Sequence, residues 1–318
     1  MAPPSEELDL RHTTATDGAL AIETKGLTKA FGSRVVVDDL TFQIPKGCVA
    51  AFVGPNGAGK TTTIRMLLGL VYPTSGSARV LGGTLNHPES YLPRVGALIE
   101  GPAFYPPLSG RANLEVLRSL GQLKTENVDQ VLELVGLDKR SNDRVSRYSL
   151  GMKQRLGVAA ALLPEPELLV LDEPANGLDP TGIAAMRKLL RNVADEGITV
   201  LVSSHQLSEV QQVADWVILI NQGRLKYQGR LAQLLEKSGT IFVSPERATD
   251  VERLARALRN AGYEPVTVGP GRLMVKTDES PSKMNRLAME MGIMLSELHA
   301  QSSLERVYFA MTDGGSIA

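Results

Sequence analysis

The glycine-rich stretch "GPNGAGKTT", from Gly54 to Thr62, has residue types and a spacing that suit the binding of phosphate groups. Its glycines let the backbone curl so that successive N–H groups point inward at phosphate oxygens. Lys60 can reach the outer phosphates, the Thr61 hydroxyl can ligate Mg²⁺, and a helix that begins here adds the positive end of its dipole. The alternative is a glycine-rich turn with a chance lysine. The apolar run before the loop and the helical composition after it favour a nucleotide site.

An acidic pair, Asp172 and Glu173, ends the apolar run "LLVLDEP". Asp172 at a strand's C-terminal edge can orient Mg²⁺ and its waters, and Glu173 can polarise a water molecule for attack on a γ-phosphate. Adjacent residues of a strand point to opposite faces, so the two carboxylates can divide these roles only where the strand ends. Taken alone, the pair could instead be a surface cap. A phosphate loop alone is compatible with GTPases, kinases and many ATPases. The acidic pair reduces the number of these classes that fit the sequence.

The elements that must position these residues follow from the apolar pattern. "CVAAFVG", "ELLVLDEP" and "ITVLVSSH" are continuous apolar runs, typical of strands that are buried on both faces. Helical patterns lie between them, among them residues 60–70 and 182–196. This alternation indicates an α/β fold with a mostly parallel sheet. "LTFQI" alternates apolar and polar residues and predicts a half-exposed antiparallel strand, and "DWVILINQGRL" predicts a strand and a turn.

We expect three regions along the chain: a disordered lead-in over residues 1–19, a large domain over 20–237 and an accessory domain over 238–318. The lead-in lacks the basic start and apolar core of a signal peptide. In the accessory domain the patterns predict β, α, β–β, α, β and a short tail, which suits a small α+β ferredoxin-like fold. Its apolar helix stripes, such as Val251, Leu254 and Leu258, should pack on the sheet rather than line a ligand site.

Charge and composition narrow the functional classes further. Lys plus Arg number 34 against 35 Asp plus Glu, so there is no overall basic field, and nucleic acid is disfavoured as the main partner. The single cysteine, Cys48, excludes an internal disulfide and should be a small core residue. No uninterrupted apolar run approaches the length that spans a bilayer, so a membrane role requires a partner.

Further motifs stand in a fixed order around the acidic pair: "RYSLGMKQRLGVAAALL" before it, and "NGLDP" and "LVSSH" after it. In this order the chain resembles the ATPase subunit of an ATP-binding cassette (ABC) transporter, over about residues 20–235. "GALIEGPAFYPPLSGRANL" and "SLGMKQRLG" are similar to the subgroup of bacterial drug and antibiotic exporters, including those for bacitracin. The resemblance implies a P-loop cassette with a mostly parallel core sheet, an antiparallel β subdomain and a helical subdomain, which hydrolyses ATP with Mg²⁺.

The resemblance also implies roles for single residues. Phe31 would stack on adenine, although alone it would be an ordinary core phenylalanine. Glu173 would be the catalytic carboxylate, and His205 the switch histidine at the γ-phosphate, although alone His205 would suit a structural role. The metal would be held by Thr61, Glu100 and Asp172. The loop residues that would bind the nucleotide are Gly54, Pro55, Asn56, Gly57, Ala58, Gly59, Lys60, Thr61 and Thr62.

Three positions in the matching stretches carry another residue type than the family usually has. Glu100 stands where the family usually has a glutamine that contacts Mg²⁺ or water and senses the membrane partner, and a carboxylate can still do this. Ser149 and Gly151 match the signature motif, whose serine side chain and backbone amides grip the γ-phosphate. Leu150 and Met152 replace the usual Gly and Gln beside them.

The resemblance implies partners as well. The signature motif would lie too far from its own phosphate loop to touch the same ATP, so a second ATPase subunit, the same or a related chain, would complete the site head to tail. Asp179 matches the loop that crosses between the subunits. The dimer would sit on the cytoplasmic side of the cell membrane through a polytopic permease and export a drug, antibiotic or other hydrophobic compound.

Two other classes compete with this interpretation. Soluble ABC ATPases that act on ribosomes usually carry two cassettes, and those that act on DNA carry long coiled-coil or zinc-cluster insertions. This chain has neither, and its charge is balanced, so we expect no nucleic-acid partner. A P-loop kinase would not account for the signature motif or the switch histidine.

Overall fold

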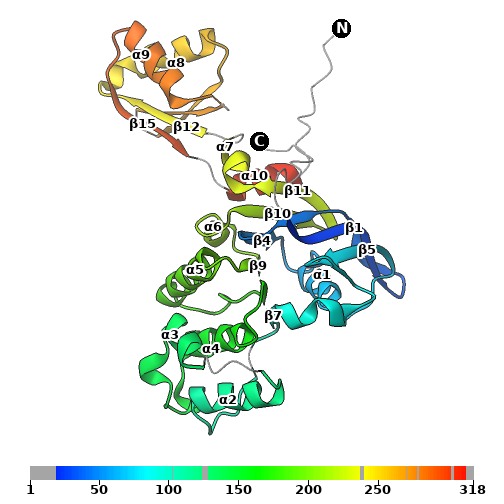
Figure 1. Ribbon diagram of the computed structural model, residues 1–318. Coiled ribbons are helices and arrows are strands. Elements are labelled where there is room, and N and C mark those ends of the chain that lie inside the picture. The colour runs from blue at the N-terminus through cyan, green and yellow to red at the C-terminus, as the bar shows by residue number, and fades with distance from the viewer. Residues whose placement is uncertain are drawn as a thin grey trace. The chain divides into compact units, whose positions relative to one another are not determined.

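The computed structural model describes residues 19–101, 103–123, 128–236, 240–269, 271–277, 279–301 and 304–312 (Figure 1). The chain forms two compact units, Met1–Arg230 and Leu231–Ala318. Apart from Ala19, the predicted lead-in lies outside the described residues. Residues 237–239, at the predicted domain boundary, lie outside them too.

A six-stranded sheet forms the centre of the first unit and carries the site. Neighbouring strands are parallel except for the β10–β11 hairpin at one edge. The predicted mostly parallel α/β sheet is therefore confirmed. The register places Val53 beside Ser204 and Ser203 beside Asp172, so the carboxyl ends of three strands meet at one edge. In spatial order the strands are β11 (Arg224–Arg230), β10 (Trp216–Asn221), β4 (Val49–Val53), β9 (Thr199–Ser204), β8 (Leu168–Asp172) and β7 (Val95–Leu98).

A smaller antiparallel sheet packs on the same core. Its buried Phe42 ring lies 5.5 Å from that of Phe52 in the parallel sheet. The single strand predicted for "LTFQI" is wrong in detail, because the strand is interrupted at Thr41 and Phe42. At this interruption the Phe42 amide donates to the buried Thr24 hydroxyl (2.9 Å). The sheet runs β2 (Arg34–Leu40), β1 (Leu20–Phe31), β5 (Ser75–Val80) and β6 (Gly83–Thr84), and β3 (Gln43–Pro45) also pairs with β1.

Cys48 packs against this core, as predicted, and its thiol bonds the Pro45 carbonyl (3.3 Å). Burial, with the nearby charge of Asp215, raises the pKa of the Cys48 thiol to about 12. The thiol therefore stays protonated at neutral pH, and we assign it no chemistry.

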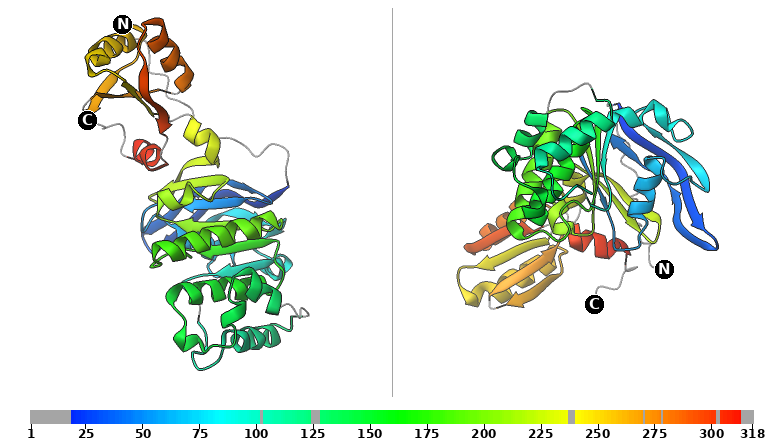
Figure 2. Two further views of the ribbon diagram at one scale, coloured as in Figure 1. Left: turned by 90° about the vertical axis from the view of Figure 1, so that its left-hand side faces the viewer. Right: turned by 90° about the horizontal axis from the view of Figure 1, so that it is seen from below.

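The helices of the first unit form two groups (Figures 1 and 2). Three helices pack on one another as the predicted helical subdomain: α2 (Gly110–Leu120), α3 (Val128–Leu134) and α4 (Leu150–Leu162). The others flank the strands: α1 (Lys60–Leu67), α5 (Pro180–Asp195) and α6 (Leu207–Val210). Short 3₁₀ turns occur at Pro88–Ser90, Leu92–Arg94, Asp138–Arg140 and Val145–Arg147. Across the described part of the chain, no helix combines the length and apolarity that crossing a bilayer requires.

The second unit contains the predicted ferredoxin-like fold. Its antiparallel sheet has the order β13–β14–β12–β15, and two helices cover one face. Leu254, Leu258 and Met284 are fully buried against strand residues, so the apolar stripes pack as predicted. The elements are β12 (Thr240–Pro245), a 3₁₀ turn (Ala248–Asp250), α8 (Val251–Asn260), β13 (Pro265–Gly269), β14 (Arg272–Lys276), α9 (Pro281–Glu290) and β15 (Leu295–Gln301).

Two further helices in this unit did not follow from the patterns. The short tail predicted after the last strand is wrong, because residues 304–312 form α10 (Leu304–Thr312), with Leu304, Val307 and Tyr308 buried. Their spacing of three and four residues is that of a helix face. Helix α10 contacts α7 (Leu231–Glu236). Along the chain, the first compact unit therefore ends at Arg230. The predicted domain boundary after residue 237 stays a prediction.

Candidate nucleotide-binding and active site

The phosphate loop connects β4 to α1 in a conformation that needs its glycines. Gly59 has φ +100°, and a Cβ there would lie 2.8 Å from the Val36 carbonyl oxygen. A Cβ on Gly54 would lie 2.5 Å from the Ile220 carbonyl oxygen. The Gly223 amide donates to the Ala58 carbonyl (3.1 Å) and holds the loop from the β10–β11 turn. Larger residues would therefore push the loop out of place.

Lys60, the first residue of α1, folds back over this loop. Its ammonium donates to the Gly54 carbonyl (2.8 Å) and lies 3.1 Å from a carboxylate oxygen of Glu173. The side chain is only 6% exposed. The Lys60 ammonium is buried and contacts a carbonyl oxygen and a carboxylate oxygen. It is therefore well placed to exchange these contacts for contacts with phosphate oxygens.

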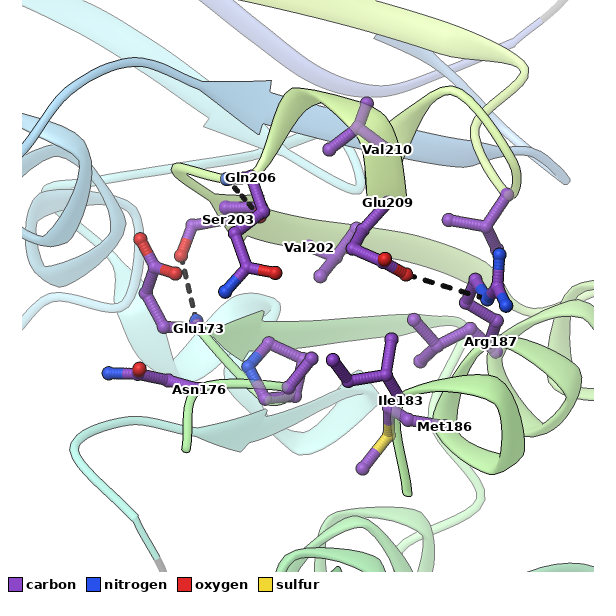
Figure 3. A pocket seen from close by; sticks show the side chains of 15 residues that line it. Glu173, Asn176, Ile183, Met186, Arg187, Val202, Ser203, Gln206, Glu209 and Val210 are labelled. Atoms are coloured by element: carbon purple, nitrogen blue, oxygen red, sulfur yellow. Dashed lines mark hydrogen bonds and ion pairs between the residues drawn. The ribbon is translucent and has the colours of Figure 1, made fainter. Parts of the chain in front are cut away.

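Asp172 lies between two hydroxyl groups. One carboxylate oxygen accepts from Thr61 (2.7 Å) and the other accepts from Ser203. The Ser203 hydroxyl also accepts from the Glu173 amide (2.9 Å), as Figure 3 shows. Ser203, fully buried in β9, thereby fixes both acidic residues at the end of β8. No sequence motif pointed to Ser203, although it lies in the quoted stretch "LVSSH".

Glu173 and His205 face each other across the ends of two strands. Glu173 has φ +52°, in the left-handed region, which turns it away from the line of β8. Such a conformation costs roughly 1–3 kcal/mol for a residue that is not glycine, and it recurs at functional sites. One Glu173 carboxylate oxygen lies 2.8 Å from His205 Nδ1 while the other contacts Lys60. The predicted lysine, carboxylate and histidine are therefore in direct contact.

A cavity of about 440 Å³ lies over these residues. That volume is in the range that holds a nucleotide-sized ligand. Arg34, Val36 and Asn176 also line it; no motif contains the first two, and Asn176 belongs to "NGLDP", where only Asp179 had a predicted role. Arg34 and Val36 belong to β2, which reaches the cavity only because the antiparallel sheet folds against the loop. The predicted residues in the lining are Pro55, Asn56, Gly57, Gly59, Lys60, Thr61, Thr62, Glu173 and His205.

The remaining predicted residues lie outside the cavity lining. The Phe31 side chain is 52% exposed at the end of β1, with the Lys29 ammonium 5.0 Å from the ring centre. Glu100 has φ +62° and forms an ion pair with Arg65 of α1. The others are Gly54 and Ala58 in the loop, Asp172 at the end of β8, and Ser149, Gly151 and Asp179 at helix starts.

Comparison with known proteins decides the family. The ABC transporter family model matches residues 37–176. The chain is 40% identical over 302 residues to the bacitracin transport ATP-binding protein BcrA of Bacillus licheniformis, covering 93% of this chain and 98% of that protein. The chain belongs to the ABC transporter ATP-binding proteins. The lantibiotic transport ATP-binding protein SrtF of Streptococcus pyogenes is 40% identical over 204 residues, which cover 64% of this chain and 88% of that protein.

Solved structures agree with the fold. A solved ATP-binding subunit of an ABC transporter is 30% identical, covers 67% of this chain and 91% of its own, and superposes with a TM-score of 0.60. The sequence-based prediction of an ABC ATPase of the bacitracin-type group is confirmed. This chain is therefore an ABC ATPase that binds ATP.

A second, small pocket shares Glu173 and Asn176 with the phosphate-loop cavity and has apolar side chains in its lining (Figure 3). Ile183 and Met186 of α5, Val202 of β9 and Val210 of α6 surround a space of about 30 Å³, the volume of about one water molecule. Arg187 of α5 forms an ion pair with Glu209 of α6 (3.5 Å) at its edge. This packing supports the segments that carry Glu173 and His205, and the space is too small for a ligand.

The donor set suits Mg²⁺ without enclosing it. Thr61 and Asp172 offer hydroxyl and carboxylate oxygens, the ligands that this ion prefers. Among the described residues, no cluster of three or more His, Cys, Asp or Glu side chains could hold a metal by itself. Mg²⁺ at nucleotide sites keeps waters and binds substrate phosphates beside one or two protein ligands, which is what these residues allow.

Proposed function

We propose that this ABC ATPase hydrolyses Mg²⁺-ATP at an interface shared with a second ATPase subunit and thereby powers export of an antibiotic or similar hydrophobic compound through a membrane permease. One contact carries the proposal: Glu173 lies between Lys60 and His205 at the edge of the phosphate-loop cavity. In this proposal the carboxylate would lie beside the terminal phosphate, which is supported by the hydrogen bond from the Glu173 amide to Ser203 that fixes the Glu173 backbone.

The geometry supports a specific order of events. The Lys60 ammonium contacts Glu173, so the carboxylate is engaged. Phosphate oxygens of ATP compete for Lys60 and leave Glu173 to accept a proton from the attacking water. His205 stays bonded to the second carboxylate oxygen and orients it. Bound Mg²⁺, held by Thr61 and Asp172, would neutralise the negative charge that develops on the phosphates.

The shared site is supported by where the signature motif lies. Ser149 caps α4 by accepting from the Met152 amide (3.2 Å), and Ser149 and Leu150 are exposed. Asp179 likewise caps α5 by accepting from the Gly182 amide (2.8 Å). Neither cap lines the cavity, so the start of α4 is available to the phosphate of a second subunit and Asp179 to contacts with that subunit.

The transport role is supported by family membership and by two relatives whose names specify antibiotic transport. Membership of the transporter family implies a membrane permease as the partner. We infer that the permease is encoded separately and that this subunit docks on its cytoplasmic side. The alignment with a bacitracin transport protein over 98% of that protein's length supports a cargo of the same class.

Glu173→Gln tests the proposed chemistry. We expect ATP turnover to fall by at least about 100-fold because the amide cannot take a proton, while ATP affinity changes by less than about threefold because shape and hydrogen bonding survive. Glu167→Gln is the matched control, since Glu167 lies just before β8 and pairs with Lys46 and Arg94. Near-normal turnover in Glu173→Gln would remove this residue from the catalytic role.

A further inference from the structure

A groove of about 500 Å³ lies between helices α8 and α9 of the second unit. Ala257 of α8 and Ala261, the residue that follows α8, form one side, and Leu287 of α9 and Met291, the residue that follows α9, form the other. The two alanines create the space, because longer side chains at these positions would fill it. The groove thus has an apolar floor that the packing of the fold leaves open, and its volume is that of a small-molecule site.

The edge of this groove is cationic. Arg256 and Asn260, one turn apart on α8, line it beside the alanines. Within the described part of the chain, Arg256 has no hydrogen bond or ion pair. Neighbouring Arg253 is already engaged, because its guanidinium bonds Asp250 (2.7 Å) and the Met291 carbonyl (3.4 Å). Arg256 is therefore an exposed cation that lines an apolar groove and that pairs with no side chain of the described residues.

Carboxylates near the groove do not remove this charge. Glu252 lies one turn before Arg256, and Glu290 precedes Met291, but both are exposed and neither lines the groove. Among the described residues, the polar groups of the lining are two arginines and an amide, and no acidic side chain belongs to it. The complement of such a lining is a negatively charged head joined to an apolar body.

We propose that the α8–α9 groove binds a small amphipathic anion, with a carboxylate or phosphate head on Arg256 and Asn260 and a short apolar chain against Leu287 and Met291. The ligand is a free molecule rather than a bilayer surface. A bilayer surface would contact all exposed cations of α8, including Arg259. A ligand in the groove would contact Arg256 but not Arg259, because Arg259 lies outside the lining.

Titration calorimetry on the full-length chain tests the proposal, with octanoate and octyl phosphate as probes and octylammonium as the reversed-charge control. We expect one site with a dissociation constant of about 1 mM or below for at least one anion, and no binding of the cation. Arg256→Glu should weaken binding by at least about tenfold, because a charge-assisted bond becomes a repulsion. Arg259→Glu, the matched control, should change it by less than about twofold.

Two further measurements make the test decisive. Ala257→Leu should also weaken binding, because its side chain would occupy the groove, and thermal melting shows whether each variant is folded. Vesicles of phosphatidylglycerol and phosphatidylcholine should not sediment the protein. The proposal is overturned if neither anion binds, if Arg259→Glu weakens binding as much as Arg256→Glu, or if vesicle binding through both arginines replaces binding of the free probes.

Discussion

Ser203 connects two side chains that the proposed mechanism needs in fixed positions. Its hydroxyl donates to Asp172 and accepts from the Glu173 amide, and it is fully buried. Alanine would leave a carboxylate oxygen and a backbone N–H without this partner. Losing a buried hydrogen-bond partner costs about 1–3 kcal/mol, and here the cost falls on the groups that would hold Mg²⁺ and activate water in the proposed mechanism.

We therefore expect Ser203→Ala to lower kcat for ATP hydrolysis by about tenfold or more, with a smaller effect on KM. Thr199→Ala is the matched control. Thr199 lies at the opposite end of β9, is buried, and accepts from the Gly47 amide through its hydroxyl (3.0 Å). Both variants should lose similar stability in thermal melts, and only Ser203→Ala should lose turnover. Equal turnover in the two variants would show that Ser203 has only a structural role.

The residues of the site were predictable from sequence where a local motif carries them. Lys60 and Thr61 follow the glycine loop, and Glu173 follows an apolar strand, so their chemistry shows in their spacing. Ser203 and Arg34 were not predictable, because strand register and the folding of a second sheet bring them to the site. Such long-range pairing leaves no local pattern in one sequence.

At the scale of elements, Ser149 has two separable roles. Its side chain caps the amino end of α4, and in the proposed dimer it also meets the γ-phosphate held by the other subunit. Replacing a cap with alanine costs about 1 kcal/mol of stability, which the chain can tolerate. A bulky cation at the same position would in addition block the approach of the second subunit.

Lys60→Ala and Ser149→Arg should therefore fail in different ways. Lys60→Ala should weaken ATP binding to the monomer by about tenfold or more, because the phosphates lose their buried ammonium. Ser149→Arg should keep monomer affinity within about threefold and abolish ATP-driven dimerisation in light scattering. Ser109→Arg, at the equivalent cap of α2 (3.1 Å to the Ala112 amide), should still dimerise. If both Lys60→Ala and Ser149→Arg lost monomer affinity equally, the signature motif would belong to the chain's own site.

Elements were predicted well where periodicity is strong and poorly where tertiary contacts decide. The three buried strands and the βαββαβ order of the second unit follow from apolar runs and helix stripes. "LTFQI" failed because the hydroxyl of Thr24, far earlier in the chain, captures the Phe42 amide and bends the strand. The sequence pattern predicts a tail rather than a helix at 304–312, because this helix is short and its apolar face spans few residues.

At the scale of the whole molecule, the chain should be separable into two folding units. The first compact unit ends at Arg230, the last residue of β11. Helix α7 belongs to the second unit, where it contacts α10. A chain that ends at Arg230 should therefore be soluble, melt cooperatively and bind ATP within about threefold of the full length.

A chain that ends at 237 distinguishes this division from the predicted boundary. It retains α7 but lacks α10, so the buried side chains of Leu231 and Leu234 would lose packing. We expect it to melt at a lower temperature than the chain that ends at Arg230. The reverse order of melting temperatures would show that α7 folds with the cassette, as the sequence boundary predicts.

The surface segment after Glu100 is the place where the proposed permease should dock. The Tyr105 side chain is 62% exposed, yet its backbone is held firmly. The Tyr105 amide donates to the side chain of buried Asn113 (2.8 Å), and the Asn113 amide group donates back to the Tyr105 carbonyl (3.1 Å). A rigidly mounted, exposed tyrosine is the kind of residue that contributes most to protein interfaces. The neighbouring Pro102 lies outside the described residues.

We expect Tyr105→Glu to reduce co-purification with a co-expressed membrane protein from the adjacent reading frame by at least about tenfold, because a charge would have to be buried in an apolar contact. Monomer ATP binding should not change, since Tyr105 lies outside the cavity lining. Tyr72→Glu is the matched control, because Tyr72 is 77% exposed on a different segment. Equal loss in both variants would point to general surface effects. If the unaltered chain captured no membrane protein and its ATP turnover rose with RNA, ribosomes or DNA, the transporter role itself would be wrong.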